Sequence, residues 1–174
     1  MSLEIERKFL VRDDRWRGQV AESGHLRQGY LANAPACSVR VRVAGHLAWL
    51  SVKGMQPGRV RDEFEYEIPG QDAEHMLAAF GGGTLVEKIR HRVPIGRHEF
   101  EVDEFLGANE GLVIAEIELD RPDEEFPRPP WLGDEVTDYA RYYNFRLADA
   151  PFRGWPEALQ RTVQQGQDAN GGRR

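Results

Sequence analysis

The sequence predicts a mainly β protein of the α+β class, in which eight antiparallel strands close into a barrel and helices pack on its outside. Charged and apolar residues alternate through at least seven segments, which is the period of a β-strand. The strand segments are even in number and mostly joined by short connections, as in an up-and-down barrel without exposed sheet edges. The predicted helices need an apolar surface to cover, and the Val, Ile and Phe face of the strands supplies it.

The eight predicted strands follow one another through the first 120 residues. They occupy roughly residues 3–11, 24–33, 36–44, 47–54, 59–68, 85–93, 97–106 and 112–120. Short "AGH" and "IGR" segments predict tight hairpins after the third and sixth strands, and "GMQPG" predicts a turn after the fourth. Links of this kind favour antiparallel pairing of strands that are neighbours in the sequence.

Three segments are typical of helices. Residues 72–83 begin with Asp72 as the expected N-cap and end in three glycines. Residues 134–148 place apolar side chains at helical spacing, and residues 156–165 carry Pro156 at their start. We therefore expect one domain over residues 1–165, followed by a disordered polar tail over 166–174.

Composition excludes several classes of protein. The chain has 174 residues and a formal net charge of −6, so it has no bulk attraction for nucleic acid or an anionic membrane. Its single cysteine, Cys37, cannot form an intramolecular disulfide. No segment resembles a signal peptide or a membrane span. We expect a cytoplasmic monomer or homodimer without nucleic-acid or membrane partners.

The charged face of the predicted strands is unusual in composition. In "LEIERKFLV" the residues Glu4, Glu6 and Lys8 share one face, which in a single strand would simply face water. The same alternation recurs in strand after strand, with few of the Thr, Ser and Gln residues that solvated strand faces carry. If the apolar face is covered from outside, the charged face must line the interior of the barrel.

The charges of the predicted barrel interior indicate which class of ligand it binds. A barrel of about eight strands has room inside for side chains or one small ligand. Buried charges are costly unless they are paired or bind something. Inward Arg and Lys side chains suit phosphate groups, and clustered carboxylates suit Mg²⁺ or Mn²⁺. Both sets in one barrel indicate chemistry on a metal–polyphosphate complex.

At this point the motifs resemble a known family. "EIERK" matches the E-x-E-x-K signature of the CYTH superfamily, the triphosphate tunnel metalloenzymes. The resemblance continues in order through "RVR", "VKG", "DEFEYEI", "EKIRH", "EVDEF", "GLVIAEIEL" and "RYYNFRLA", and so covers about residues 3–150. The chain looks most like the short bacterial inorganic tripolyphosphatases. The resemblance implies an eight-stranded antiparallel tunnel, with the helix over 134–148 near one mouth.

The resemblance also implies roles for individual residues. The triphosphate-binding residues would be Lys8, Arg40, Arg42, Lys53, Lys88 and Arg90. One or two divalent ions, Mg²⁺ or Mn²⁺, would be held by Glu4, Glu6, Asp103, Glu116 and Glu118. Glu63 and Glu65 would be either further ligands or internal partners of the basic residues.

The expected activity is metal-dependent hydrolysis of a small-molecule triphosphate, inorganic tripolyphosphate above all, to pyrophosphate and orthophosphate. Lys88 and Tyr30 are the candidate proton acceptors. Each has a plainer alternative, since Lys88 could be a phosphate ligand alone and Tyr30 a packing aromatic. Alternative functions are a class IV adenylate cyclase or a thiamine triphosphatase in the same scaffold, and a polyphosphate-binding module without catalysis.

Overall fold

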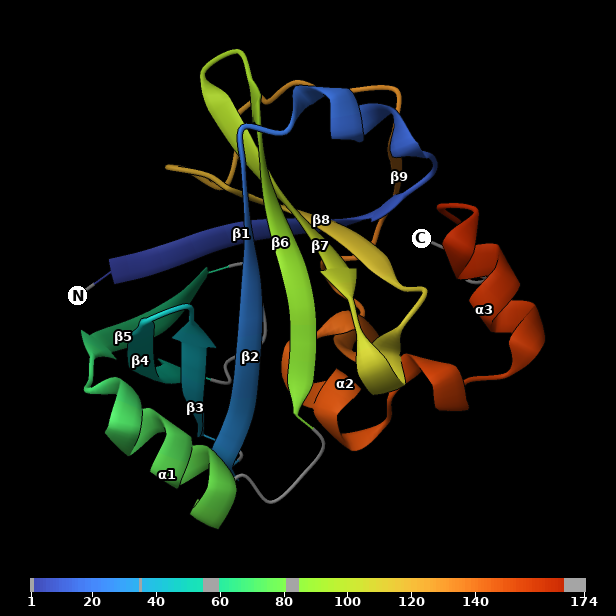
Figure 1. Ribbon diagram of the computed structural model, residues 1–174. Coiled ribbons are helices and arrows are strands. Elements are labelled where there is room, and N and C mark those ends of the chain that lie inside the picture. Colours follow the sequence, from blue (N-terminus) through green and yellow to red (C-terminus); the bar gives the residue numbers. More distant parts are fainter. Residues whose placement is uncertain (1, 35, 55–59, 81–84, 168–174) are drawn as a thin grey trace.

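The protein folds around one antiparallel sheet with helices packed around it (Figure 1), as described here from a computed structural model. The structure describes residues 2–34, 36–54, 60–80 and 85–167, and side chains are described for all of these except residues 2–4, 60 and 61. The strands are β1 Ser2–Val11, β2 Glu22–Asn33, β3 Cys37–Ala44, β4 Leu47–Gly54, β5 Val60–Glu67, β6 Val86–Ile95, β7 His98–Phe105, β8 Val113–Glu118 and β9 Leu132–Glu135.

The strand order is β5-β4-β3-β2-β6-β7-β8-β1-β9, and β1 pairs in addition with β5. The mainly β, antiparallel prediction is confirmed, and the eight predicted strands are present to within a few residues. The predicted count of eight is wrong because β9 pairs with the end of β1, where the register shifts between Phe9 and Val11. With only four residues and no alternation, β9 carries no strand signal of its own.

Two hairpins have the tight turns that the sequence predicts. Gly45 joins β3 to β4 with a φ of 60°, and Gly96 joins β6 to β7 with a φ of 63°. Glycine adopts these left-handed values without steric cost. Most of the turn predicted at "GMQPG" lies outside the described residues.

The helix predicted over residues 134–148 is wrong in its first ten residues. Its start is the end of β9, a 3-10 turn η3 follows at Ala140–Tyr142, and only α2, Asn144–Asp149, is α-helical. The Val136 N–H donates to the Lys8 carbonyl at 2.8 Å, and the Lys8 N–H donates to Thr137 Oγ1 at 3.0 Å. Pairing with β1 thus holds the start of this segment in an extended conformation, and tertiary contacts override the local periodicity.

The helix α1, Gly70–Phe80, covers the outer face of β2, β3 and β4. It buries Ala73 and Leu77 against Val41, Val43 and Ala48. This helix starts two residues earlier than predicted, so Asp72 lies in its first turn instead of at the N-cap, and its predicted glycine end falls outside the described residues. The other helical segments are η1 Asp14–Gln19, η2 Gly107–Asn109, η4 Phe152–Gly154 and α3 Glu157–Gln164.

The end of the described chain packs against β9. Gly166 is buried, and its carbonyl accepts a hydrogen bond from the Asp134 N–H at 2.8 Å. A Cβ atom at Gly133 would lie only 2.3 Å from the Gly166 carbonyl oxygen, so the two glycines allow this close contact. Of the predicted tail, residues 168–174 lie outside the described residues.

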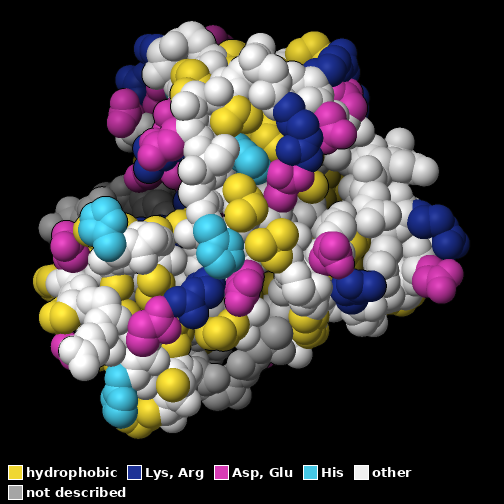
Figure 2. Space-filling model, in the orientation of Figure 1, with side chains coloured by type: hydrophobic (Ala, Val, Ile, Leu, Met, Phe, Trp, Pro, Cys, Tyr) yellow, Lys and Arg dark blue, Asp and Glu magenta, His cyan; other side chains and the backbone are white. Residues whose placement is uncertain are grey.

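The outer surface carries mixed charges. Figure 2 shows basic and acidic side chains interspersed on the face turned to the viewer, without a large patch of either sign. Large apolar side chains that are exposed include Phe64, Tyr66 and Phe80. Within the described part of the chain, no helix has both the length and the apolarity needed to cross a membrane.

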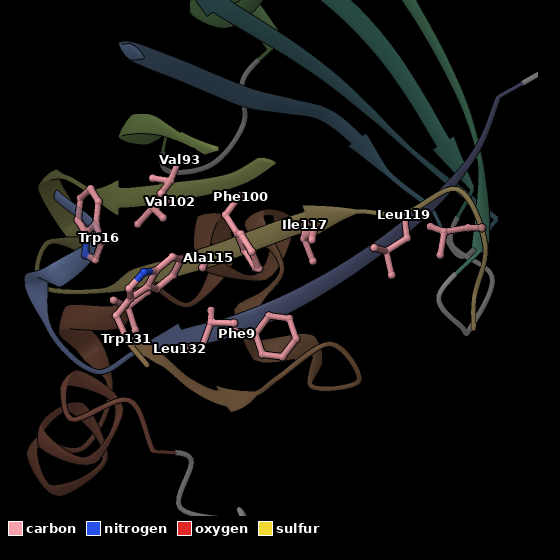
Figure 3. Close-up of a cluster of buried hydrophobic side chains, with 12 residues drawn as sticks. Phe9, Trp16, Val93, Phe100, Val102, Ala115, Ile117, Leu119, Trp131 and Leu132 are labelled. Carbon is pink, nitrogen blue, oxygen red and sulfur yellow. The ribbon is translucent and has the colours of Figure 1, made fainter. Parts of the chain in front are cut away.

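One apolar core covers the outside of β1, β7 and β8 (Figure 3). Phe9, Trp16, Phe100 and Trp131 are its largest members, and the Trp131 ring packs edge-on against Phe100 with ring centres 5.4 Å apart. Because side chains alternate across a strand, covering this face leaves the charged face of the same strands on the inner side.

A second apolar core fills one end of that inner side. Leu10, Val86, Phe105 and Ile114 lie on the charged strand face, one step beyond the last charged residues. They pack against the C-terminal segment, whose contributions are Val136, Tyr142, Leu147, Ala148, Phe152 and Val163. The space between the strands is therefore blocked by apolar side chains at this end.

Candidate active site

A cavity of about 820 Å³ lies on the inner side of the strands. At one end, Tyr143, Asn144 and Phe145 line it, and we call these three residues the floor. At the other end it is lined by the exposed residues Arg92, Arg97, Glu99 and Asp120, which we call the mouth. The charged residues between them are Glu6, Lys8, Arg40, Arg42, Lys53, Glu63, Glu65, Lys88, Arg90, Glu101, Glu116 and Glu118.

Lys8 lies at the centre of the acidic wall formed by β1 and β8. Its Nζ contacts Glu6 at 2.5 Å and also contacts Glu116. Although burial opposes both charges, Lys8 and its neighbouring cations hold the pKa of Glu116 well below its usual range. The carboxylates in turn raise the pKa of Lys8, so this buried pair stays ionised.

Arg90 of β6 connects three carboxylates. Its Nη2 lies 2.7 Å from Asp103 Oδ2 and 3.0 Å from Glu116 Oε2, and its Nη1 contacts Glu101. Asp103 also contacts Lys88, and the exposed fractions of these two side chains are 0% and 1%. Asp103 therefore lies behind the cavity wall, where it fixes the two basic side chains that reach the cavity.

The wall formed by β3, β4 and β5 has its own ion pairs. Arg42 lies 2.9 Å from Glu65, and Arg40 lies 3.4 Å from Glu63. Lys53 lies 3.9 Å from Glu63 and bridges to the acidic wall at 3.9 Å from Glu6. The cavity is thus nearly balanced in charge, and each cation that could hold an anion has a carboxylate beside it.

The two candidate proton acceptors have opposite pKa shifts. Burial and the neighbouring Arg90 lower the pKa of Lys88, although Asp103 and Glu116 act in the other direction. Burial raises the pKa of Tyr30 to about 12, against the opposing effect of Arg40 and Lys8. A lysine with a lowered pKa is the better base near neutral pH, while Tyr30 stays a neutral hydrogen-bond donor.

The carboxylates of β1, β7 and β8 offer oxygen ligands of the kind that Mg²⁺ and Mn²⁺ prefer. Glu6 lies directly opposite Glu118, and Glu101 directly opposite Glu116, and such like-charged pairs are destabilising without a cation. Among the described residues, no three Asp, Glu, His or Cys side chains already converge on one metal position. The donor set fits a divalent ion once the basic residues of the cavity release these carboxylates.

Most predicted site residues come together in the cavity. Tyr30 and the charged residues proposed from the sequence line it, apart from Asp103, which is buried behind the wall, and Glu4, whose side chain lies outside the described residues. Sequence reasoning missed Gln28, Ser38 and Ser51, and in the floor it missed Asn144 and Phe145. The strand alternation could have indicated Gln28, which precedes Tyr30 by two residues. The resemblance placed the segment of the floor near one mouth, but it gave no role to Asn144 and Phe145, because the segment does not fold as its periodicity predicts.

Comparison with known proteins places this cavity in a family. A family model described as the CYTH domain matches residues 2–148. An inorganic triphosphatase of Acetivibrio thermocellus is 43% identical over 157 residues, which cover 90% of this chain and all of that protein. An inorganic triphosphatase of Nitrosomonas europaea is 37% identical over 150 residues, covering 83% and 96% of the two chains.

Solved structures agree with the sequence comparison. The crystal structure of the inorganic triphosphatase NE1496 superposes with a TM-score of 0.63 at 36% identity, covering 85% of this chain and 95% of the other. The PH1012 protein of Pyrococcus horikoshii, at 19% identity and a TM-score of 0.55, shares the fold over 69% of this chain and 81% of its own. With the family pattern matched from β1 through α2 and relatives aligned over nearly their full length, this chain belongs to the CYTH domain family.

Proposed function

We propose that this chain is a cytoplasmic inorganic triphosphatase that hydrolyses tripolyphosphate to pyrophosphate and orthophosphate with Mg²⁺ or Mn²⁺. One observation carries the proposal: a single cavity presents a set of Lys and Arg side chains suited to phosphates beside carboxylates suited to a divalent ion. The names of the relatives, which span most of this chain, support the same activity.

We infer that the sheet closes into the eight-stranded tunnel that the sequence predicts, with β9 added outside the ring. This inference is supported by the place of β1, which pairs with β8 through Glu6 to Leu10 and with β5 through Ser2 to Ile5. A closed ring leaves no edge among the eight strands and shields the cavity from bulk water on all sides except the mouth.

The triphosphate would be held by Lys8, Arg40, Arg42, Lys53, Lys88 and Arg90, all of which line the cavity. Guanidinium groups offer paired donors to phosphoryl oxygens, and lysines add compact point charges. Glu63 and Glu65 are better suited to pairing with these cations than to metal binding, because they already contact Arg40 and Arg42.

The divalent ion would be held by Glu6, Glu116 and Glu118, together with Glu4 as the family resemblance implies. When bound, it would neutralise charge on phosphoryl oxygens and activate a water. We assign Asp103 the positioning of Lys88 and Arg90 in place of the metal-ligand role that the resemblance implied, since its carboxylate is completely buried between them.

In the reaction, water attacks a terminal phosphorus atom, the bridging P–O bond breaks, and the leaving chain departs as pyrophosphate. Lys88 accepts the proton of the attacking water, as its lowered pKa favours. The remaining cations orient the chain and stabilise charge on the transferring phosphoryl group, which is most of what phosphoryl transfer requires. Tyr30, whose raised pKa keeps its hydroxyl protonated beside Lys8 and Arg40, would donate a hydrogen bond to the substrate.

A phosphate-release screen tests the function. Purified protein with Mg²⁺ or Mn²⁺ is offered tripolyphosphate, ATP, thiamine triphosphate and pyrophosphate, and the products are separated by anion exchange. We expect tripolyphosphate to yield pyrophosphate and orthophosphate, and EDTA to stop the reaction. Cyclic AMP or thiamine diphosphate as the main product would replace the proposal with the corresponding enzyme. Tight binding of tripolyphosphate without turnover would indicate a binding module.

A further inference from the structure

The floor of the cavity is held in place from behind. The Tyr143 hydroxyl donates to the Thr137 carbonyl at 2.8 Å, which ties the floor to the segment paired with β1. The Phe145 ring meets the rings of Tyr30 and Tyr143, with centres 6.4 Å and 5.8 Å apart. These contacts fix Asn144, which lies between the two aromatic residues and lines the cavity.

Asn144 has an unmet hydrogen-bonding group. Its Oδ1 atom is buried and has no hydrogen-bond partner among the described residues. Buried amide groups in folded proteins nearly always have a partner, and an unsatisfied one is destabilising. A second buried asparagine of this region is satisfied: Asn109 donates to the Leu147 carbonyl at 3.2 Å and accepts from the Phe152 N–H at 2.8 Å. Asn144 thus differs from Asn109 in having an amide oxygen without a partner among the described residues, at a position that lines the cavity.

The surroundings of the floor are uncharged but polar. Gln28, Tyr30 and Ser38 line the cavity, and Gln28 and Ser38 are only 1% and 5% exposed. Tyr30 also lies close enough to Arg40 and Lys8 for both to affect its pKa. Neutral donors thus occupy the deep end of the cavity, and the cations begin directly beside them.

We propose that Asn144 is a specificity-determining residue that hydrogen-bonds the terminal phosphoryl group lying deepest in the cavity. This inference rests on the proposed function. The amide can turn to present its NH₂ group to an ionised phosphoryl oxygen or its carbonyl to a protonated one. A free terminal phosphoryl group satisfies the amide, whereas an esterified end would press its substituent against Tyr143 and Phe145. Asn144 therefore selects chains whose inserted end is unesterified.

Calorimetry with metal-free protein and tripolyphosphate tests this role, alongside phosphate release with Mg²⁺. Asn144→Leu keeps the approximate size but removes the hydrogen bond, and we expect a Kd and a KM about tenfold higher, the size of one hydrogen bond to a charged group. We expect kcat to change less than twofold and Tm not to fall, since no internal hydrogen bond is lost. Asn144→Asp should weaken binding further by adding like charge, and Asn144→Ser should bind better than Asn144→Leu.

Asn109→Leu is the matched control, which should lower Tm and leave the Kd of the folded protein unchanged. If Asn144→Leu lowers Tm but leaves Kd and KM unchanged, the residue is structural and the inference is wrong. Equal Kd values for Asn144→Leu, Asn144→Ser and the parent protein would also overturn it. Absence of tripolyphosphate hydrolysis by the parent protein overturns the proposed function instead, while metal-free binding still reports on Asn144.

Discussion

Lys88 and Asp103 form an ion pair that is almost completely removed from solvent. Such a pair adds little to stability, because desolvation of two charges offsets their attraction. Its value lies in holding Lys88 in place through the hydrogen bond that the Lys88 amine donates to Asp103. Burial and Arg90 still lower the pKa of Lys88, against the opposing effect of Asp103. A base that releases its proton readily and is held in one place suits the attack of water on phosphorus.

The variant Lys88→Arg distinguishes a role of Lys88 as the catalytic base from a role as a phosphate ligand alone. The neutral amine is the active base, so kcat of the parent protein should rise with pH through the lowered pKa of Lys88 and then level off. An arginine keeps the positive charge but stays protonated, so the variant should lose this rise and about 10²- to 10⁴-fold of kcat, with KM nearly unchanged. A pH–rate profile checks this. An unchanged profile would leave Lys88 as a phosphate ligand alone.

Arg42→Ala removes a cation of the cavity wall. We expect kcat/KM for tripolyphosphate to fall about 10- to 100-fold, as for the loss of a charge-assisted contact to phosphate. Arg153→Ala is the control, because Arg153 pairs with Glu110 at the surface and is 63% exposed. Arg7 is unsuitable as a control, since it lies 2.5 Å from Glu135 at 12% exposure and supports the packing of β9 on β1. Equal losses of kcat/KM in Arg42→Ala and Arg153→Ala would contradict the placement of Arg42 in the cavity.

Glu6→Gln tests the metal-ligand assignment. The change keeps the shape but removes the charge, so we expect turnover to be lost at saturating Mg²⁺. The fold should persist, because relief of the repulsion with Glu118 partly offsets the weaker contact to Lys8. Circular dichroism checks that the fold persists, and phosphate release checks that turnover is lost. Turnover near that of the parent protein would remove Glu6 from the metal site.

At the scale of elements, α2 decides where the cavity ends. Only six residues long, it is held by β2 and β6 and by the apolar core behind it. Its first residues provide two of the three floor positions. A short segment therefore sets the depth available to substrate, while the strands set its charge.

Phe145→Ala opens this floor without removing the C-terminal core. We expect the parent protein to prefer tripolyphosphate to ATP, because a nucleoside cannot pass the floor and must project from the mouth. In the variant, the ratio of kcat/KM for tripolyphosphate to kcat/KM for ATP should fall several-fold, since space is created beside Tyr30. Truncation after Leu147 is a poorer test, because it also removes Phe152 and Val163 from the core. A parent protein that turns over both substrates equally would refute the role of the floor.

At the scale of the whole molecule, the cavity neutralises itself. Lys8 with Glu6 and Glu116, and Arg90 with Glu116, are internal pairs made before any ligand arrives. A triphosphate competes for the basic members and a divalent ion for the acidic members. Each ligand therefore releases groups that the other can bind, which predicts positive coupling between them.

Thermal unfolding measures this coupling. A non-hydrolysable imido analogue of tripolyphosphate and Mg²⁺ are added separately and together. Ligands that bind only the folded state raise Tm, and the rise with both should exceed the sum of the single rises. Additive shifts would mean that the internal pairs do not oppose binding.

Much of this molecule could be predicted from alternation alone. Glu6, Lys8, Arg40, Arg42, Lys88 and Arg90 line one cavity because the two-residue period of a strand fixes their face. β9 and the segment before α2 could not be predicted, since their conformation comes from pairing with β1 across more than a hundred residues. Asn144 and Phe145 were missed for the same reason. Asp103 was named as a candidate ligand, but its complete burial could not be predicted, because alternation gives a face and not a depth.

The apolar core behind the floor determines the order in which the two reaction products leave the cavity. With one end blocked by Leu10, Val86, Phe105 and Ile114, both fragments of a cleaved chain must leave past the same exposed residues, in single file. The fragment nearer the mouth goes first, and the fragment against Asn144 waits behind it. The trapped fragment is then the one that competes with the next substrate for the empty cavity, so we expect this fragment to inhibit competitively and the other fragment non-competitively.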